Sequence, residues 1–292
     1  MSAVRDSRAE AKMTQPADKE APSRKKRKHV CIYGNYKNYY GYRVDRKLAE
    51  DPRLQLLKKE WFEGKDCLDI GCNQGLITIS IAKKFSCRRI VGVDIDPGLI
   101  EAAHWNLRRT AKAECPDSRL MKTSDPLISK DDHALEHNLS KSLGKDKANS
   151  PRKVPHLEEG TLLQRVSFRT DNFVENFRGC IEKYDTVICL SVTKWIHLNW
   201  GDDGLVTLFA KIWRLLRQGG ILLLEPQSWS SYRSNRLVSE IAKLNFNNIM
   251  FTPDLFQEIL LDKIGFRSMM DVSGPLSGTV AGFHRPIFLF QK

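Results

Sequence analysis

The sequence predicts an α/β fold in which a mostly parallel sheet is covered by helices on both faces. Two observations support this prediction. Apolar runs of strand length alternate with amphipathic runs of helix length along the chain. One strand candidate, 184–191 (YDTVICLS), is apolar almost throughout, as expected of a parallel strand buried on both faces.

Each element has a local signal in the sequence. The strands are expected at 66–71, 89–96, 164–170, 184–191, 221–226 and 285–292. The helices are expected at 76–85, 97–111, 202–220 and 252–266. Pro97 suits the first position of the second helix, a glycine pair ends the third, and Thr252 precedes Pro253 as an N-cap for the fourth.

Two polar segments frame the predicted domain. Residues 1–28 are charged and nearly free of aromatic residues, so we expect a disordered basic tail. Its last residues, Arg24–Lys28, form a basic block that predicts nuclear import, with a cytoplasmic pool as an alternative. Residues 115–160 have no apolar period and are expected to be a disordered insertion. The sequence therefore predicts a single domain over 29–292, interrupted at 115–160.

Composition narrows the function classes. The formal net charge of +12 favours an anionic partner. The seven cysteines include no CxxC pair, so neither a metal site nor a disulfide framework is expected. No apolar run approaches the roughly 18 residues of a membrane span, so no membrane partner is expected. Because no additional apolar face is evident, we expect a monomer.

The stretch CLDIGCNQG at 67–75 predicts a strand, a glycine turn and the start of a helix. Such a turn places backbone N–H groups at the carboxyl edge of the sheet, where open α/β sheets bind ligands. Asn73 stands where the dinucleotide fingerprint has its middle glycine, so a pyrophosphate cradle is not indicated. A packing turn in an unrelated α/β fold is the alternative.

An acid follows at the end of the next strand. Asp94 lies 23 residues after Gly71, where a carboxylate can accept hydrogen bonds from both hydroxyls of a ribose. The two features together predict a nucleoside ligand. S-adenosyl-L-methionine fits this description, and Asp69 would then lie near the ammonium group of its methionine part.

Two segments combine aromatic and basic residues. Residues 33–43 (YGNYKNYYGYR) contain five tyrosines together with Lys37 and Arg43. Residues 191–204 hold Lys194, His197 and Asn199 next to Trp195 and Trp200, directly after a predicted strand. Aromatic rings interleaved with cations suit nucleobases and phosphates. Packing of the tyrosines on the core, and a structural role for the histidine, are the alternatives.

These segments, with LDIGCNQG, VGVDID, GGILLLEPQSWSSY and FHRPIFLFQK, resemble the bicoid-interacting-protein-3-type RNA methyltransferases. The resemblance covers about 29–114 and 161–292. It implies a class I (Rossmann-like) S-adenosyl-L-methionine-dependent methyltransferase with a seven-stranded sheet, acting on the 5′-terminal phosphate of an RNA. The cofactor-binding residues expected from the turn, the acid and the resemblance are Arg43, Asp69, Gly71, Cys72, Asn73, Asp94, Ile95, Asn172, Phe173 and Leu190.

The expected reaction transfers a methyl group to the terminal (gamma) phosphate of a small RNA. A phosphate oxygen is already anionic near neutral pH, so the protein's task is positioning and charge placement. We expect Lys194 and His197 to hold the phosphate, and Tyr33 and Tyr36 to close the pocket.

Four alternatives remain at this level. The acceptor could be a 5′ monophosphate RNA end, or a small molecule or protein side chain. The chain could be a non-catalytic RNA-binding subunit that assembles with other ribonucleoprotein proteins. A nicotinamide-dependent oxidoreductase is disfavoured by the missing glycine.

Overall fold

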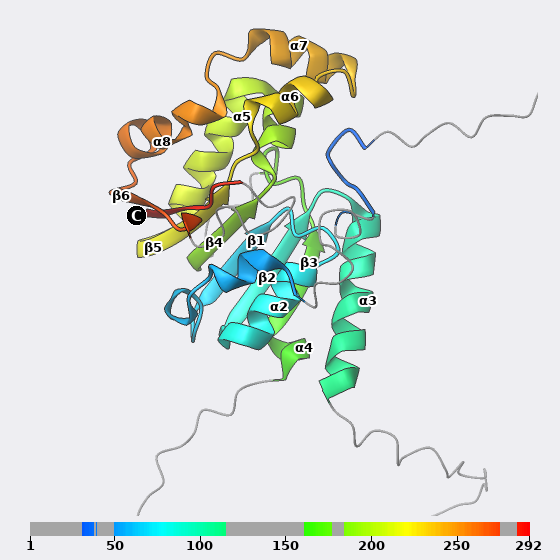
Figure 1. Ribbon diagram of the computed structural model, residues 1–292. Helices are drawn as coiled ribbons and strands as arrows, with labels where there is room; N and C mark the ends of the chain where they lie inside the picture. Colours follow the sequence, from blue (N-terminus) through cyan, green and yellow to red (C-terminus); the bar gives the residue numbers. More distant parts are fainter. Residues whose placement is uncertain (1–30, 38, 40–49, 115–160, 177–183, 275–284) are drawn as a thin grey trace, which may run out of the picture. The chain divides into compact units, whose positions relative to one another are not determined.

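A seven-stranded sheet runs through the part of the chain that the structure describes (Figure 1). This computed structural model describes residues 31–37, 39, 50–114, 161–176, 184–274 and 285–292. The strands are β1 (Asp66–Ile70), β2 (Arg89–Asp94), β3 (Val166–Thr170), β4 (Tyr184–Leu190), β5 (Leu216–Glu225), β6 (Ser268–Asp271) and β7 (Phe288–Gln291). Their order in the sheet is β3-β2-β1-β4-β5-β7-β6.

The predicted tail (1–28) and insertion (115–160) lie outside the described residues, as does Arg43. The prediction of a single interrupted domain therefore stays a prediction. The residues from Cys31 to Lys292 belong to one compact unit.

The sheet is mixed, not parallel throughout. The neighbours from β3 to β5 pair in parallel, whereas β7 runs antiparallel to both β5 and β6. The prediction of seven strands is confirmed, and that of a mostly parallel sheet holds for the β3 to β5 part. Strand β6 was not predicted, because this edge strand is short and largely exposed and so lacks an apolar run.

Successive residues of the central strands contribute to different cores. Cys67, Ile188 and Leu223 belong to one hydrophobic cluster, and their neighbours in sequence, Leu68 and Val187, belong to a second. Side chains of a strand alternate between the two faces of the sheet, so each face carries its own core. The prediction that both faces are covered is confirmed.

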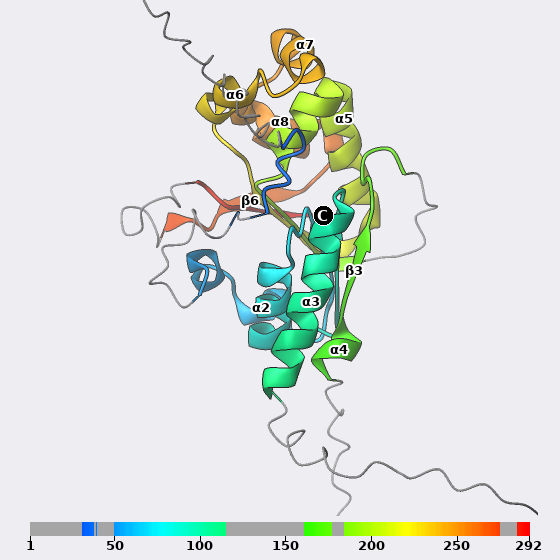
Figure 2. The same cartoon turned by 90° about the vertical axis from the view of Figure 1, so that its right-hand side faces the viewer.

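The helices divide between these two cores (Figures 1 and 2). Residues of α2 (Leu76–Phe85) and α3 (Pro97–Glu114) pack in the first cluster, with the 3₁₀ turns η1 (Pro52–Gln55) and η2 (Lys59–Trp61) and the short α4 (Leu162–Arg165). Residues of α5 (Thr193–Leu215), α8 (Phe256–Glu258) and the π-helix η5 (Ile259–Ile264) pack in the second; the 3₁₀ turn η4 (Pro253–Leu255) precedes α8. The bounds of α2 match the prediction.

Helix α5 differs most from its prediction. It begins at Thr193, nine residues before the predicted start at 202, and it ends before the predicted glycine pair because β5 already starts at Leu216. Gly201 interrupts it with φ 65° and ψ −166°. At this kink the side chain of Asn245 donates a hydrogen bond to the carbonyl of Leu198. The first half of α5 is thus a separate helical segment after β4.

Two further helices, α6 (Trp229–Asn235) and α7 (Glu240–Asn248), follow β5 and were not predicted. Leu198 of α5, Tyr232 of α6 and Ala242 of α7 form a third small core (Figures 1 and 2). Ser239 caps α7 by accepting a hydrogen bond from the backbone N–H of Ala242.

The strand order locates the ligand site. The chain moves from β1 to β3 on one side and from β4 outward on the other, so β1 and β4 meet at a topological switch point. Open α/β sheets bind ligands in the crevice beyond the carboxyl ends of such strands. Among the described residues, no helix is long and apolar enough to cross a bilayer.

Candidate cofactor and acceptor site

A pocket opens where the sequence predicts it, beyond the ends of β1, β2 and β4. Most of the predicted cofactor-binding residues line it: Asp69, Gly71, Cys72, Asn73, Asp94, Ile95, Asn172, Phe173 and Leu190. Tyr33 lines it as well, whereas Tyr36, Lys194 and His197 are not among the lining residues. The residues gathered there come from segments more than 100 positions apart.

The glycine turn after β1 is tightly built. Gly71 has a φ of 75°, and a Cβ at this position would lie 2.3 Å from a methyl group of Val192. The N–H groups of Gly71 and Cys72 both donate to the carbonyl of Val93 on β2. Asn73 adopts a φ of 52°, a left-handed conformation that asparagine tolerates better than most residues. The turn thus needs glycine at 71 and accepts asparagine at 73.

The carboxylate of Asp94 lies beside this turn. Its two oxygens accept the backbone N–H groups of Asn73 (2.9 Å) and Asp96 (3.0 Å). Burial raises the pKa of Asp94, although these backbone hydrogen bonds oppose the shift. Such a carboxylate is held in one orientation and remains an acceptor for ligand hydroxyl groups.

Asp69, on β1, is only 4% exposed. It accepts a hydrogen bond of 2.6 Å from the hydroxyl of Thr78. Burial raises the pKa of Asp69 to about 6, while Thr78 and the charge of Arg53 act in the opposite direction. An acid in this position favours a cationic group at the same end of the pocket.

Arg53, which was not predicted as a site residue, lines the pocket from η1 and is 4% exposed. Its Nε and Nη2 atoms donate to the carboxylate of Asp51, and its Nη1 donates to Glu225 at 2.8 Å. The segment DPRL carries no motif, and only the fold brings Arg53 to Glu225. No local signal would have identified it.

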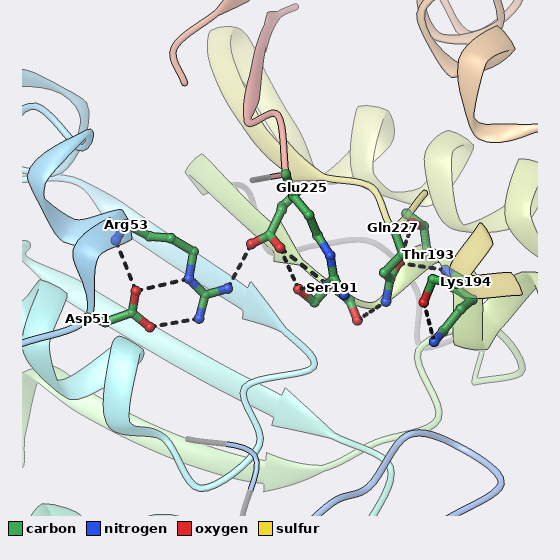
Figure 3. A network of polar contacts seen from close by, with 9 residues as sticks. Asp51, Arg53, Ser191, Thr193, Lys194, Glu225 and Gln227 are labelled. Atoms are coloured by element: carbon green, nitrogen blue, oxygen red, sulfur yellow. Dashed lines mark hydrogen bonds and ion pairs between the residues drawn. The ribbon is translucent and has the colours of Figure 1, made fainter. Parts of the chain in front are cut away.

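A polar network extends from Arg53 to the start of α5 (Figure 3). Glu225 accepts a hydrogen bond from the hydroxyl of Ser191 (2.7 Å), a pocket residue with a φ of 62°. Gln227 accepts hydrogen bonds from the hydroxyl of Thr193 and the backbone N–H of Lys194, and its amide donates to the Ser191 carbonyl. The end of β5 thereby fixes the first turn of α5 relative to the pocket.

The two predicted aromatic–basic segments do meet. Residues 31–37, here called the strap, pack against the first half of α5. Tyr33 stacks on Trp200 with ring centroids 5.7 Å apart, and Tyr36 meets Trp195 edge to face at 5.8 Å. A Cβ at Gly34 would collide with the indole of Trp195. Because Tyr33, Trp195 and Trp200 also line the pocket, they form an aromatic border on one side of it.

Lys194 lies next to this border. Its Nζ atom is 4.1 Å from the centroid of the Trp195 ring and donates to the hydroxyl of Ser231 on α6 at 3.0 Å. The side chain is 4% exposed. Lys194 does not itself line the pocket, but its ammonium group packs against the Trp195 ring, which does.

His197 is fully buried in this structure. Its Nε2 is 2.7 Å from Asp202 and its Nδ1 is 3.3 Å from the hydroxyl of Tyr232, and the rings of Phe251 and Phe256 pack around it. Burial lowers the pKa of His197, against the opposing effect of Asp202. Both ring nitrogens face protein partners, so the structure does not bring His197 to the pocket.

Comparison with known proteins agrees with the site. A sequence model of the bicoid-interacting protein 3 family matches residues 184–292, and one for ribosomal protein L11 methyltransferase matches 53–129. A probable RNA methyltransferase of Arabidopsis thaliana is 54% identical over 270 residues, which are 92% of this chain and 83% of that protein. The chain belongs to the bicoid-interacting protein 3 family.

Two relatives carry more specific names. The U6 snRNA methylphosphate capping enzyme of Drosophila melanogaster is 36% identical over 89% of this chain and 74% of its own length. The 7SK snRNA methylphosphate capping enzyme of Homo sapiens is 39% identical over 92% of this chain, but this chain spans only 40% of it. Among solved structures, the N-methyltransferase NodS from Bradyrhizobium japonicum has a TM-score of 0.44 and 14% identity, covering 84% of this chain and 99% of that one.

Membership of the family confirms the predicted class I fold, the enzyme class and the cofactor. The chain is an S-adenosyl-L-methionine-dependent methyltransferase. The pocket fits this cofactor on structural grounds, because Asp94 offers acceptors for ribose hydroxyls and Asp69 offers an acid for an ammonium group. The backbone at Gly71 has no room for a side chain.

Proposed function

We propose that this enzyme methylates the 5′-terminal phosphate of a small RNA, and that the acceptor is the gamma phosphate of a triphosphate end. The observation that carries this proposal is the aromatic border of the cofactor pocket, with the buried cation Lys194 packed on its Trp195 ring. Rings suit a nucleobase, and an ammonium group suits a phosphate. The names of the U6 and 7SK relatives support an RNA end as acceptor.

The bound cofactor supplies a methyl group on a sulfonium. The chain's own residues hold the acceptor in line with it. In this proposal, Lys194 exchanges its hydrogen bond with Ser231 for one with a terminal phosphate oxygen. Its charge then orients the anion without protonating it. Tyr33 stacks on the first nucleobase, and Tyr36 supports Trp195 from the side.

His197 has a different role from the one expected from the sequence. We propose that it positions the first half of α5, because it links this half to Asp202 beyond the Gly201 kink. Asp202 in turn accepts the backbone N–H of Met250, which follows α7. Lys194 and Trp195 therefore depend on His197 for their place, although it is remote from the phosphate.

The cofactor residues keep the roles that the sequence suggested. Asp94 binds the ribose and Asp69 the ammonium group, and the backbone at 71–73 borders the cofactor. Ile95, Asn172 and Phe173 surround the adenine, and Leu190, at the end of β4, faces the methyl centre. Asn172 is held for this role, since its Oδ1 accepts the backbone N–H groups of Val174 and Glu175. Arg43, outside the described residues, remains a candidate for the cofactor carboxylate.

The setting of this activity is also a proposal. The basic block Arg24–Lys28 and the small nuclear RNA relatives favour a nuclear enzyme. Its partners would be the RNA and other proteins of the same ribonucleoprotein, with the enzyme itself a monomer.

A 5′ monophosphate end is the second candidate acceptor. Relatives named as RNA 5′-monophosphate methyltransferases are 26–30% identical to this chain. The capping enzymes, at 36–39%, are more similar and align over more of the chain. This difference favours the acceptor of the capping enzymes, which we propose to be a triphosphate end.

The test is a labelled-methyl assay on one RNA with a 5′ triphosphate, monophosphate or hydroxyl end. We expect label on the triphosphate RNA. The label should resist a phosphomonoesterase, because the terminal phosphate is now a methyl ester, and it should be released by a pyrophosphatase that cleaves the anhydride between the α and β phosphates. Preference for the monophosphate would select the second candidate, and label independent of the 5′ end would exclude both. Binding of RNA without transfer, in an enzyme that binds cofactor, would favour a non-catalytic RNA-binding subunit.

A further inference from the structure

Asn35, in the middle of the strap, has an unusual environment. Its Oδ1 atom is buried and has no hydrogen-bond partner within the described part of the chain, although the side chain lines the pocket. Its Nδ2 atom donates a short hydrogen bond of 2.6 Å to Asp96. Buried polar atoms in proteins nearly always have a partner, so an orphaned acceptor in a ligand pocket indicates a ligand donor.

The orientation of the amide follows from Asp96. Burial by itself would raise the pKa of Asp96, but hydrogen bonds from Asn35 and from the N–H groups of Leu99 and Gly98 outweigh it and hold the pKa below its usual value. An ionised carboxylate only accepts hydrogen bonds. Asn35 must therefore present its NH₂ group to Asp96, which places its carbonyl oxygen on the opposite side.

The position of Asn35 identifies the donor. Asp96, its partner, donates its own N–H to Asp94, the acid at the proposed ribose position, and both Asn35 and Asp94 line the pocket. A nucleoside offers hydroxyl donors at this position. We propose that Asn35 is a cofactor-binding residue, whose Oδ1 accepts a hydrogen bond from one ribose hydroxyl while Asp94 accepts from the other, and that it so ties the strap to the bound cofactor.

The strap's other contacts explain why this bond matters. Asn199 of α5 donates to the carbonyl of Ile32. Asn73 and Gln74, from the glycine turn, donate to the carbonyls of Tyr36 and Lys37. Hydrogen bonds from the rest of the protein thus hold both ends of the strap, while the Oδ1 of Asn35 in its middle is left for the ligand. The bound cofactor adds a hydrogen bond to the middle of the strap, which carries Tyr33 and Tyr36. Cofactor binding therefore orders the acceptor side of the pocket.

The test is calorimetric titration of the purified chain with S-adenosyl-L-homocysteine and its 2′-deoxy and 3′-deoxy analogues. Asn35→Leu should weaken binding of S-adenosyl-L-homocysteine about tenfold, the effect of one hydrogen bond of about 1.4 kcal/mol. One of the two deoxy analogues should bind the wild type about tenfold more weakly than S-adenosyl-L-homocysteine does. On Asn35→Leu, the same analogue and S-adenosyl-L-homocysteine should bind with almost equal affinity. Asn199→Leu, which loosens the strap away from the pocket, should not abolish the response to the deoxy analogues.

The proposal would be overturned if the affinity losses caused by Asn35→Leu and by removal of a hydroxyl were additive for both deoxy analogues, or if Asn35→Leu bound the ligand as tightly as the wild type. Either result is expected if the partner of Asn35 is a water molecule. Hydrogen exchange of the wild-type strap is a second measurement that needs no variant. S-adenosyl-L-homocysteine should slow exchange at residues 34–37, and the critical deoxy analogue should slow it less. If all three ligands protected the strap equally from hydrogen exchange, the proposed hydrogen bond between Asn35 and the ribose would be refuted. Neither measurement contains RNA, so the outcome is independent of the proposed acceptor.

Discussion

Arg53 and Glu225 form a buried ion pair across the centre of the fold, with Nη1 and Oε2 2.8 Å apart although 172 positions separate the residues. Their side chains are 4% and 2% exposed. Glu225 also accepts the Ser191 hydroxyl at the pocket, so this pair joins η1 to the end of β5 and to the cofactor site. Its loss should affect stability and cofactor binding together.

Arg53→Met should destabilise the chain by about 3 kcal/mol, because it removes the cation that pairs with the buried carboxylates of Asp51 and Glu225, although Arg285 still lies 3.4 Å from Glu225. Urea unfolding followed by circular dichroism measures the change. Lys59→Ala serves as the control, since it removes an exposed pair with Glu63 and should cost no more than about 0.5 kcal/mol. Equal effects of the two substitutions would show that burial of the Arg53 pair is unimportant.

Gly71→Ala should abolish cofactor binding, whereas Gly64→Ala should not. Both glycines have a positive φ, of 75° and 66°, so both substitutions carry the same backbone strain of about 1 kcal/mol. Only the Cβ at position 71 meets a neighbour, Val192, while position 64 has open space. Calorimetric titration of both variants with S-adenosyl-L-homocysteine separates the effect of backbone strain from that of the contact between the new Cβ and Val192. If the two variants bind equally well, the tight fit of the turn is not what shapes the pocket.

Cofactor affinity should rise as the pH increases through about 6. Burial raises the pKa of Asp69 to about 6, so the acid is protonated below this pH and anionic above it, and only the anion attracts an ammonium group. In the protein without cofactor, the pH dependence of folding stability has the opposite sign. Between about pH 4 and 6 the folded chain binds more protons at Asp69 than the unfolded chain does, so this residue's contribution to stability falls as pH rises.

Titrations with S-adenosyl-L-homocysteine from about pH 5 to 8 test this prediction, with Asp69→Asn as the control. The raised pKa of Asp94 contributes its own pH dependence, which the control retains. The difference between the two profiles therefore isolates Asp69. Parallel profiles would mean that Asp69 does not contact the ammonium group.

Lys194→Met should lower kcat/KM for RNA methylation about 10²-fold while leaving cofactor affinity nearly unchanged. Methionine preserves the stem that packs on Trp195 but removes the charge. Lys292→Met is the matched control, because Lys292 also lies over a tryptophan, Trp213, outside the pocket lining. A comparable loss of activity in both variants would point to stability and away from phosphate binding.

Asp94→Asn should have the opposite effect and weaken cofactor binding at least about tenfold. Either orientation of the new amide turns its NH₂ group toward a backbone donor, at Asn73 or Asp96, so the turn and the ligand acceptor are both disturbed. Titration of the variant with S-adenosyl-L-homocysteine is the measurement. Unimpaired binding would remove Asp94 from the ribose site.

His197→Gln should retain more activity than His197→Ala. Glutamine can keep a hydrogen bond to Asp202, whereas alanine leaves a cavity among Tyr232, Phe251 and Phe256 and should cost about 2–5 kcal/mol of stability. Thermal unfolding and methylation assays at a temperature where both variants are folded separate the two roles. A folded His197→Gln protein as inactive as Lys194→Met would return His197 to the phosphate.

The sequence alone determined the parts of this enzyme that depend on neighbouring residues. The strand, glycine turn and helix at 66–85, the acid Asp94 and the alternation of strands with helices are local patterns, because apolar period, caps and turn residues act within a few positions. These patterns located the cofactor pocket, and the quoted motifs identified the family.

Tertiary structure decided what depends on distant contacts. The pairing of Arg53 with Glu225, the burial of His197 and the orphaned acceptor of Asn35 appear in no local pattern, because each results from segments that meet only when the sheet forms. The same holds for the start of α5 at Thr193, which Gln227 stabilises from the end of β5. Burial and partner together set the chemistry of a polar side chain, and both are properties of the folded chain.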